Sequence, residues 1–164
     1  MSKVSQQKLL NTLFEIVYGR GFQSQDREDR ILLQKAIFLM REVGISCGKY
    51  FFVWDHYGPF SPELSDDMKL PVDPDEQDMS FNDATEKVMQ QLSELFSSPF
   101  EYSQLHWVET IASLKYMKDY MYPTYDDEQL IAELEARKGY LSRHDENQKA
   151  MAALNAFMAE YTIC

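Results

Sequence analysis

The chain has 164 residues and a net charge of −11, and 45% of its residues are apolar. This length suits one folded domain with a continuous core, and the apolar fraction excludes a disordered chain. Residues 1–60 carry eight Lys and Arg against six Asp and Glu, whereas residues 61–164 carry eight against twenty-one. An acidic body disfavours non-specific binding to nucleic acid, because such binding neutralises phosphates with cations. It fits a protein whose partner is basic.

The cysteines and the N-terminal segment indicate the compartment. Cys47 and Cys164 are isolated, and they form neither a disulfide framework nor a zinc-binding spacing. We therefore expect a reducing cytoplasm. The first ten residues lack the apolar core of a signal peptide, and no apolar run approaches the length of a membrane span.

Two helices are predicted at the start of the chain, over residues 5–19 and 26–43. The second is apolar almost all round its centre apart from Gln34 and Lys35, which predicts a helix buried in the core. Residues 49–54, "KYFFVW", are aromatic and β-branched, which is typical of a strand, although no partner strand is evident.

The segment after this strand has the chemistry of a turn followed by a helix. "YGPF" at 57–60 is turn-like, and Ser61, Pro62 and Glu63 suit the cap and first turn of a helix. This helix is predicted to run from Pro62 to about Lys69. The Pro-containing acidic stretch 71–80 is predicted to be an exposed loop.

The rest of the chain is predicted to be helical. Apolar periodicity, caps and terminal prolines place helices at residues 82–97, 104–121, 126–138 and 145–160. We therefore predict a mainly α, compact single domain over residues 1–164, with about seven helices and one short strand or hairpin.

The sequence offers no positive reason to predict an enzyme. His56, His106 and His144 are scattered outside any metal-ligand spacing, and no nucleophile elbow or phosphate-binding loop occurs. Asp55 and His56 are neighbours at a predicted strand end, so their side chains should point to opposite faces. We assign no catalytic residue, metal ligand or cofactor.

A DNA-binding regulator is the alternative to a protein-binding domain. Helices followed by a short strand and a turn are compatible with a winged helix-turn-helix. A recognition helix over residues 26–43 would need Arg27, Arg30 and Lys35 on one exposed face. Acidic residues in the same helix dilute this face, which favours a buried helix with mixed charge at its rim.

For the "YGPF" turn, two interpretations stay open. Tyr57, Pro59 and Phe60 either pack on the helix at 26–43 and cap the core, or form part of an interface. Both can hold, because a turn anchored by core aromatic residues is also pre-organised for binding.

Two motifs resemble a known family. "LLQKAIFLM" at 32–40 is similar to the "LQKLLYL" helix of the Panacea, or SocA-like antitoxin, domain family. "YFFVWDHYGPFSPEL" at 50–64 is similar to the segment that follows it, and it looks closest to the YwgA-like branch, which commonly reads "HYGPYSPEL". Residues 109–117 and 130–154 are more loosely similar, and Gly139 stands where a proline is usual.

The resemblance implies a compact, mainly helical fold with winged-helix character. Members of the family resemble modular antitoxins that neutralise toxins by direct contact, whereas the YwgA-like branch has no assigned activity. We accordingly predict a cytoplasmic, non-enzymatic, protein-binding domain of prokaryotic type, resembling an antitoxin or an adaptor, whose partner is a toxin or another basic protein. The positions expected to serve structure first and an interface second are Gln34, Lys35, Trp54, Tyr57, Gly58, Pro59, Phe60 and Glu63.

Overall fold

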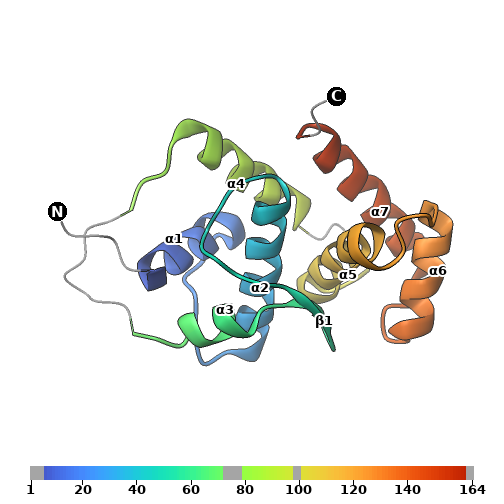
Figure 1. Ribbon diagram of the computed structural model, residues 1–164, viewed down its shortest axis with the longest axis horizontal. Coiled ribbons are helices and arrows are strands. Elements are labelled where there is room, and N and C mark those ends of the chain that lie inside the picture. Colours follow the sequence, from blue (N-terminus) through green and yellow to red (C-terminus); the bar gives the residue numbers. More distant parts are fainter. Residues whose placement is uncertain (1–5, 72–78, 98–100, 162–164) are drawn as a thin grey trace.

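The computed structural model describes residues 6–71, 79–97 and 101–161. Within these ranges the chain is mainly helical, with seven α-helices, one π-helical turn and one two-stranded hairpin (Figure 1). This confirms the predicted fold class, while the winged-helix character stays a prediction. The elements in chain order are α1 Gln6–Tyr18, α2 Arg27–Glu42, β1 Val53–Asp55, β2 Gly58–Phe60, α3 Pro62–Asp67, α4 Asp83–Leu95, α5 Gln104–Tyr116, η1 Met117–Met121, α6 Asp127–Arg137 and α7 His144–Ala159.

Local capping explains why several helices begin where the sequence predicts. The Asp26 side chain accepts a hydrogen bond from the Glu28 backbone N–H and caps α2. Ser61 caps α3, which carries proline at its first position, and Asn82 caps α4. Most of the predicted acidic loop, residues 72–78, lies outside the described residues.

The hairpin differs from the predicted single strand over 49–54. Of the predicted strand, only residues 53 and 54 belong to β1, the observed strand. Strand β1 pairs antiparallel with β2, and the register places Trp54 opposite Pro59 and Asp55 opposite Gly58. Proline lacks the backbone N–H that a strand normally donates, so β2 carries no sequence signal of a strand. This is why the partner strand was not evident in the sequence.

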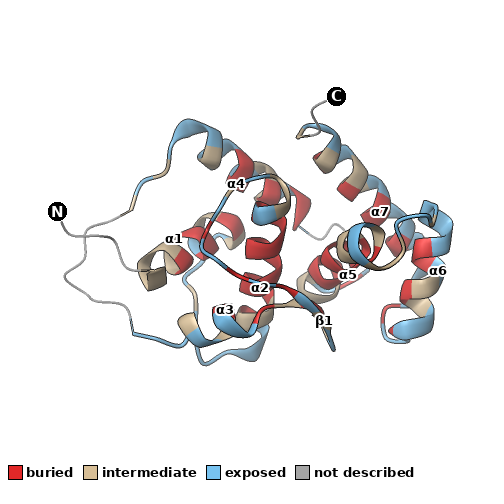
Figure 2. Ribbon diagram, viewed as in Figure 1, coloured by how far each residue is buried: buried red, intermediate tan, exposed pale blue. Residues whose placement is uncertain are grey.

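Two helices form the centre of the molecule. Every residue of α2 from Leu32 to Met40 and of α5 from Trp107 to Leu114 is buried (Figure 2). Helices α1 and α4 lie on one side of α2, whereas α6 and α7 pack beside α5 (Figure 1). The burial of α2 confirms the prediction, but α5 is buried more completely than its predicted amphipathic pattern required.

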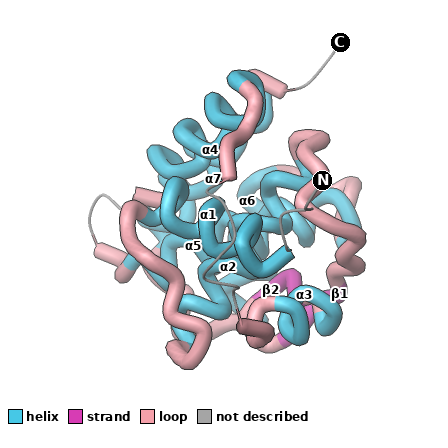
Figure 3. The backbone as a smooth tube through the Cα atoms, turned by 90° about the vertical axis from the view of Figure 1, so that its left-hand side faces the viewer, coloured by secondary structure: helices cyan, strands magenta, loops and turns pink. Residues whose placement is uncertain are grey.

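The hairpin and α3 lie together at one end of the helical body (Figure 3). Strand β2 packs on both α2 and α5, so the motif at 54–64 sits where the two central helices meet. The structure divides the predicted helix over 104–121 into two elements. Helix α5 ends at Tyr116, and the π-helical turn η1 follows it.

Candidate functional site

Two polar residues of α2 hold the second strand of the hairpin. The Lys35 ammonium donates a hydrogen bond to the Pro59 carbonyl oxygen at 2.9 Å. Gln34 forms a reciprocal pair with Ser61: its Nε2 donates to the Ser61 carbonyl, and its Oε1 accepts from the Ser61 backbone N–H, each at 2.9 Å. The two polar residues in an otherwise apolar run therefore satisfy backbone groups that would be unpaired in the core.

Lys35 is only 1% exposed. Burial lowers its pKa to about 7, although the Glu109 carboxylate acts in the opposite direction. Its hydrogen bond to Pro59 needs only an N–H group. The bond can therefore persist when the amine loses its proton near neutral pH.

A second lysine holds the turn of the same hairpin. Lys138, just after α6, donates a hydrogen bond to the His56 carbonyl oxygen, and its ammonium lies 3.1 Å from the Glu109 carboxylate. Its ammonium also lies 5.2 Å from the centre of the Trp54 ring, and the Tyr140 hydroxyl donates to Glu109. Sequence reasoning missed this group. A single carboxylate within the apolar stretch of α5 was the one signal that could have indicated it.

The glycine of the motif is required by its backbone and by its surroundings. Gly58 has φ of +97°, in the left-handed region that favours glycine. No described non-glycine residue has a positive φ, so His56 and Tyr57 turn the chain in ordinary conformations. A Cβ atom at Gly58 would lie 2.5 Å from the Ser113 hydroxyl oxygen of α5.

The other predicted positions surround this turn. Pro59 is buried, Trp54, Tyr57 and Phe60 are partly buried, and Glu63 is exposed in the first turn of α3. The Trp54 ring lies 5.8 Å from the Tyr116 ring, centre to centre. Trp54 therefore packs against the core and β2 packs against α2 and α5, while the use of "YGPF" as an interface stays a prediction.

The segment before the turn presents one face to solvent. Burial alternates from residue 49 to residue 55: Tyr50 and Phe52 are buried, whereas Phe51 is 75% and Val53 48% exposed. This period of two is that of an extended chain. Within the described ranges, residues 49–52 make no backbone–backbone hydrogen bond, and β1 is paired along one edge only.

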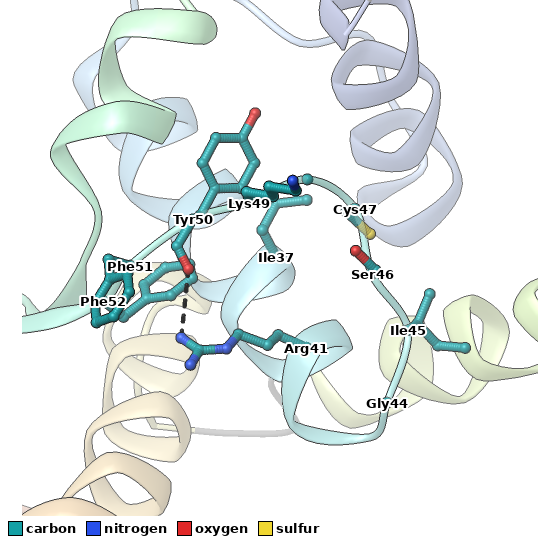
Figure 4. Close-up of a pocket in the computed structure, with 11 residues that line it drawn as sticks. Ile37, Arg41, Gly44, Ile45, Ser46, Cys47, Lys49, Tyr50, Phe51 and Phe52 are labelled. Carbon is teal, nitrogen blue, oxygen red and sulfur yellow. Dashed lines mark hydrogen bonds between the residues drawn. The ribbon is translucent and has the colours of Figure 1, made fainter.

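A pocket of about 340 Å³ adjoins this segment, lined by Ile37 and Arg41 of α2 and by residues 44–52 (Figure 4). The Arg41 guanidinium donates to the Tyr50 carbonyl at 3.5 Å and lies 5.8 Å from the Phe52 ring centre. Burial raises the pKa of the Cys47 thiol to about 11, which makes it a poor nucleophile at neutral pH. Cys164 lies outside the described residues.

The three histidines occupy different elements. His56 is exposed in the hairpin turn, and His106 is partly buried on α5. His144 is exposed at the start of α7, where the Glu135 carboxylate at 2.9 Å raises its pKa. No three His, Cys, Asp or Glu side chains among the described residues are placed to hold a metal ion. None of the described helices is long and apolar enough to cross a membrane.

The arrangement required of a recognition helix at 26–43 is not found. Lys35 is buried beneath the hairpin and cannot share an exposed face with Arg27 and Arg30. The central turns of α2 are also enclosed by α1, α4 and α5, so this helix cannot enter a DNA groove as it stands.

Comparison with protein-family models, with curated proteins and with solved structures gives no match. The similarity to the Panacea family therefore stays a prediction.

Proposed function

We propose that this chain is a non-enzymatic protein-binding domain, resembling an antitoxin or an adaptor, that binds an extended segment of a basic partner protein along residues 49–55. The observation that carries the proposal is that the outer edge of this segment pairs with no described strand and lies beside the exposed Phe51 and Val53, although the Tyr50 carbonyl accepts a hydrogen bond from Arg41.

An exposed strand edge is a template for another strand. Main-chain hydrogen bonds would supply affinity, and alternate side chains would supply specificity. Proteins normally protect such edges with charges or a covering element. Here Lys49 and Asp55 flank an apolar centre, which leaves Phe51 and Val53 as the residues that a partner would cover.

The hairpin is rigid enough to present this edge. Lys35 holds the Pro59 carbonyl from α2, and Lys138 holds the His56 carbonyl from the end of α6. A surface already fixed in its binding conformation loses less conformational entropy on association, and therefore binds more tightly.

Charge favours a basic partner. The chain carries −11 overall, and its acidic residues concentrate after residue 60. Such a field attracts a cationic protein and accelerates its association, most strongly at low ionic strength.

Affinity purification with matched variants tests the proposal. The tagged chain, Phe51→Ser and the control Leu70→Ser are expressed in the native cell, and co-eluting proteins are quantified by mass spectrometry. Leu70 is 53% exposed but lies outside the 49–55 segment. We expect one basic protein in stoichiometric amount with the wild type and Leu70→Ser, and about tenfold less with Phe51→Ser, as for a central interface residue. Equal recovery with Phe51→Ser, or repeated recovery of the chain alone, would contradict the proposal.

A further inference from the structure

A second pocket, of about 220 Å³, lies between α2, the hairpin and α3. Two arginines of α2, Arg27 and Arg30, line it together with the buried amine of Lys35, and Asp55 is the one carboxylate among its lining residues. Tyr57 and Phe60 of the hairpin add aromatic surface. The pocket thus combines an excess of positive charge with an apolar wall.

The two guanidinium groups of this pocket are available for an anion. Neither Arg27 nor Arg30 forms an ion pair with any residue that the structure describes. Arg27 lies over the Tyr57 ring at 4.6 Å from its centre, and Arg30 donates to the Ser24 carbonyl at 2.9 Å. The nearby Asp29 carboxylate is occupied, because it pairs with Arg20 at 2.6 Å.

The chemistry and the size of the pocket limit what it can hold. Guanidinium groups present a planar fork of N–H donors that matches carboxylate and phosphate oxygens. Pockets for whole drug-sized ligands and cofactors usually measure about 300–1,000 Å³. A volume of about 220 Å³ therefore suits a single anionic group on a small apolar body rather than a nucleotide.

We propose that the pocket formed by Arg27, Arg30, Lys35, Tyr57 and Phe60 binds a small organic oxyanion, either a carboxylate or a phosphate monoester. The two guanidinium groups hold the anion, and the aromatic side chains pack against its apolar part. The pocket shares Asp55 with the segment at residues 49–55, but neither Phe51 nor Val53 lines it. Phe51→Ser and Arg27→Gln/Arg30→Gln therefore test the two proposals separately.

The test is a titration of the full chain with benzoate and, separately, with phenyl phosphate, followed by NMR of backbone and arginine Nε–H signals. We expect saturable shifts around the pocket with at least one probe, at a Kd near or below about 1 mM. Saturation by benzoate would indicate a carboxylate ligand, and saturation by phenyl phosphate would indicate a phosphate monoester. Arg27→Gln/Arg30→Gln should weaken binding at least tenfold, while Arg41→Gln/Arg143→Gln removes the same net charge elsewhere and should change it less than twofold.

Two results would overturn the inference. One is the absence of saturation by both probes up to about tenfold above that Kd. The other is equal weakening in the two double variants, which would show attraction to the overall charge instead of a site. We expect both variants to fold, because all four arginines lie wholly or partly at the surface. Circular dichroism of the two variants checks this.

Discussion

At Gly58 the absence of a side chain meets two requirements at once. The backbone lies in the left-handed region at φ +97°, and α5 approaches so closely that a Cβ atom would meet the Ser113 hydroxyl at 2.5 Å. The Ser113 hydroxyl has no hydrogen-bond partner among the described residues. Removing the Ser113 hydroxyl should therefore change the stability little, so the effect of the steric contact can be measured apart from the effect of the backbone conformation.

Gly58→Ala should lower the free energy of unfolding by about 1–3 kcal/mol, because it combines backbone strain with a steric clash. Adding Ser113→Ala should restore the part due to the clash and leave the part due to φ. Urea denaturation of the single and double variants measures both. Gly139→Ala is the control, since Gly139 has no positive φ and nothing within 4 Å of a new Cβ atom. Stability equal to that of the wild type in Gly58→Ala would refute the argument.

At the scale of the element, the hairpin is a short structure whose position is fixed from both sides. Two strands of three residues are too short to be stable alone. Lys35 and Lys138 reach its carbonyl groups from different helical segments, and Glu109 compensates Lys138 within the core. A buried ion pair is weak evidence for stability, because desolvation opposes it, but this pair defines where the turn lies.

The buried Lys35 should make stability depend on pH. Its pKa is about 7 in the folded protein, against about 10.4 in an unfolded chain, so between these values the unfolded state binds more protons. The free energy of unfolding should therefore rise with pH in this window, by at most about 1.4 kcal/mol per pH unit from this group.

Lys35→Met lacks this contribution, so the wild type should gain stability relative to the variant from about pH 7 to about pH 9, below the titration of tyrosine. Chemical denaturation at several pH values in that range measures the difference. Lys49→Met is the matched control, because Lys49 is exposed. If the stability curves of the wild type and Lys35→Met ran parallel, Lys35 would not be the source.

At the scale of the whole molecule, the charge is arranged against polyanions. The net charge is −11, and α2, the helix that a DNA-binding regulator would place in a groove, is enclosed by its neighbours. Arg27, which is exposed, and Arg30, which is partly exposed, border a pocket of about 220 Å³, which is small for an extended nucleic-acid backbone.

We therefore expect no mobility shift of duplex DNA, including the chain's own promoter region, at about 50 mM salt, where phosphate contacts are strong. A shift that weakens steeply as salt increases would instead support the regulator. A known DNA-binding domain run in parallel confirms that the conditions detect binding.

The sequence predicted what local patterns determine. The apolar run around Gln34 and Lys35 predicted a core helix, and Ser61 with Pro62 predicted the start of α3, because periodicity and capping act within a few residues. It did not predict β2, whose Pro59 resembles a turn residue. It also did not predict the role of Glu109, because Lys138 lies in another helical segment and only the tertiary fold brings the two together. Polar residues within buried helices marked the positions of buried hydrogen bonds and ion pairs. Their partners could not be predicted from the spacing of residues in the sequence.

Lys35 and Lys138, which hold the hairpin, lie at very different distances from it along the sequence, and this affects the order in which the contacts can form during synthesis. Lys35 precedes Pro59 by 24 residues, whereas Lys138 follows His56 by 82. The ribosome synthesises a chain from its N-terminal end. Its hairpin can therefore be tethered to α2 early, but the turn is locked only after α6 has been made. Until then the exposed edge at residues 49–55 lies on a hairpin that only Lys35 holds. We therefore expect unwanted strand pairing to occur more readily in the nascent chain than in the finished protein.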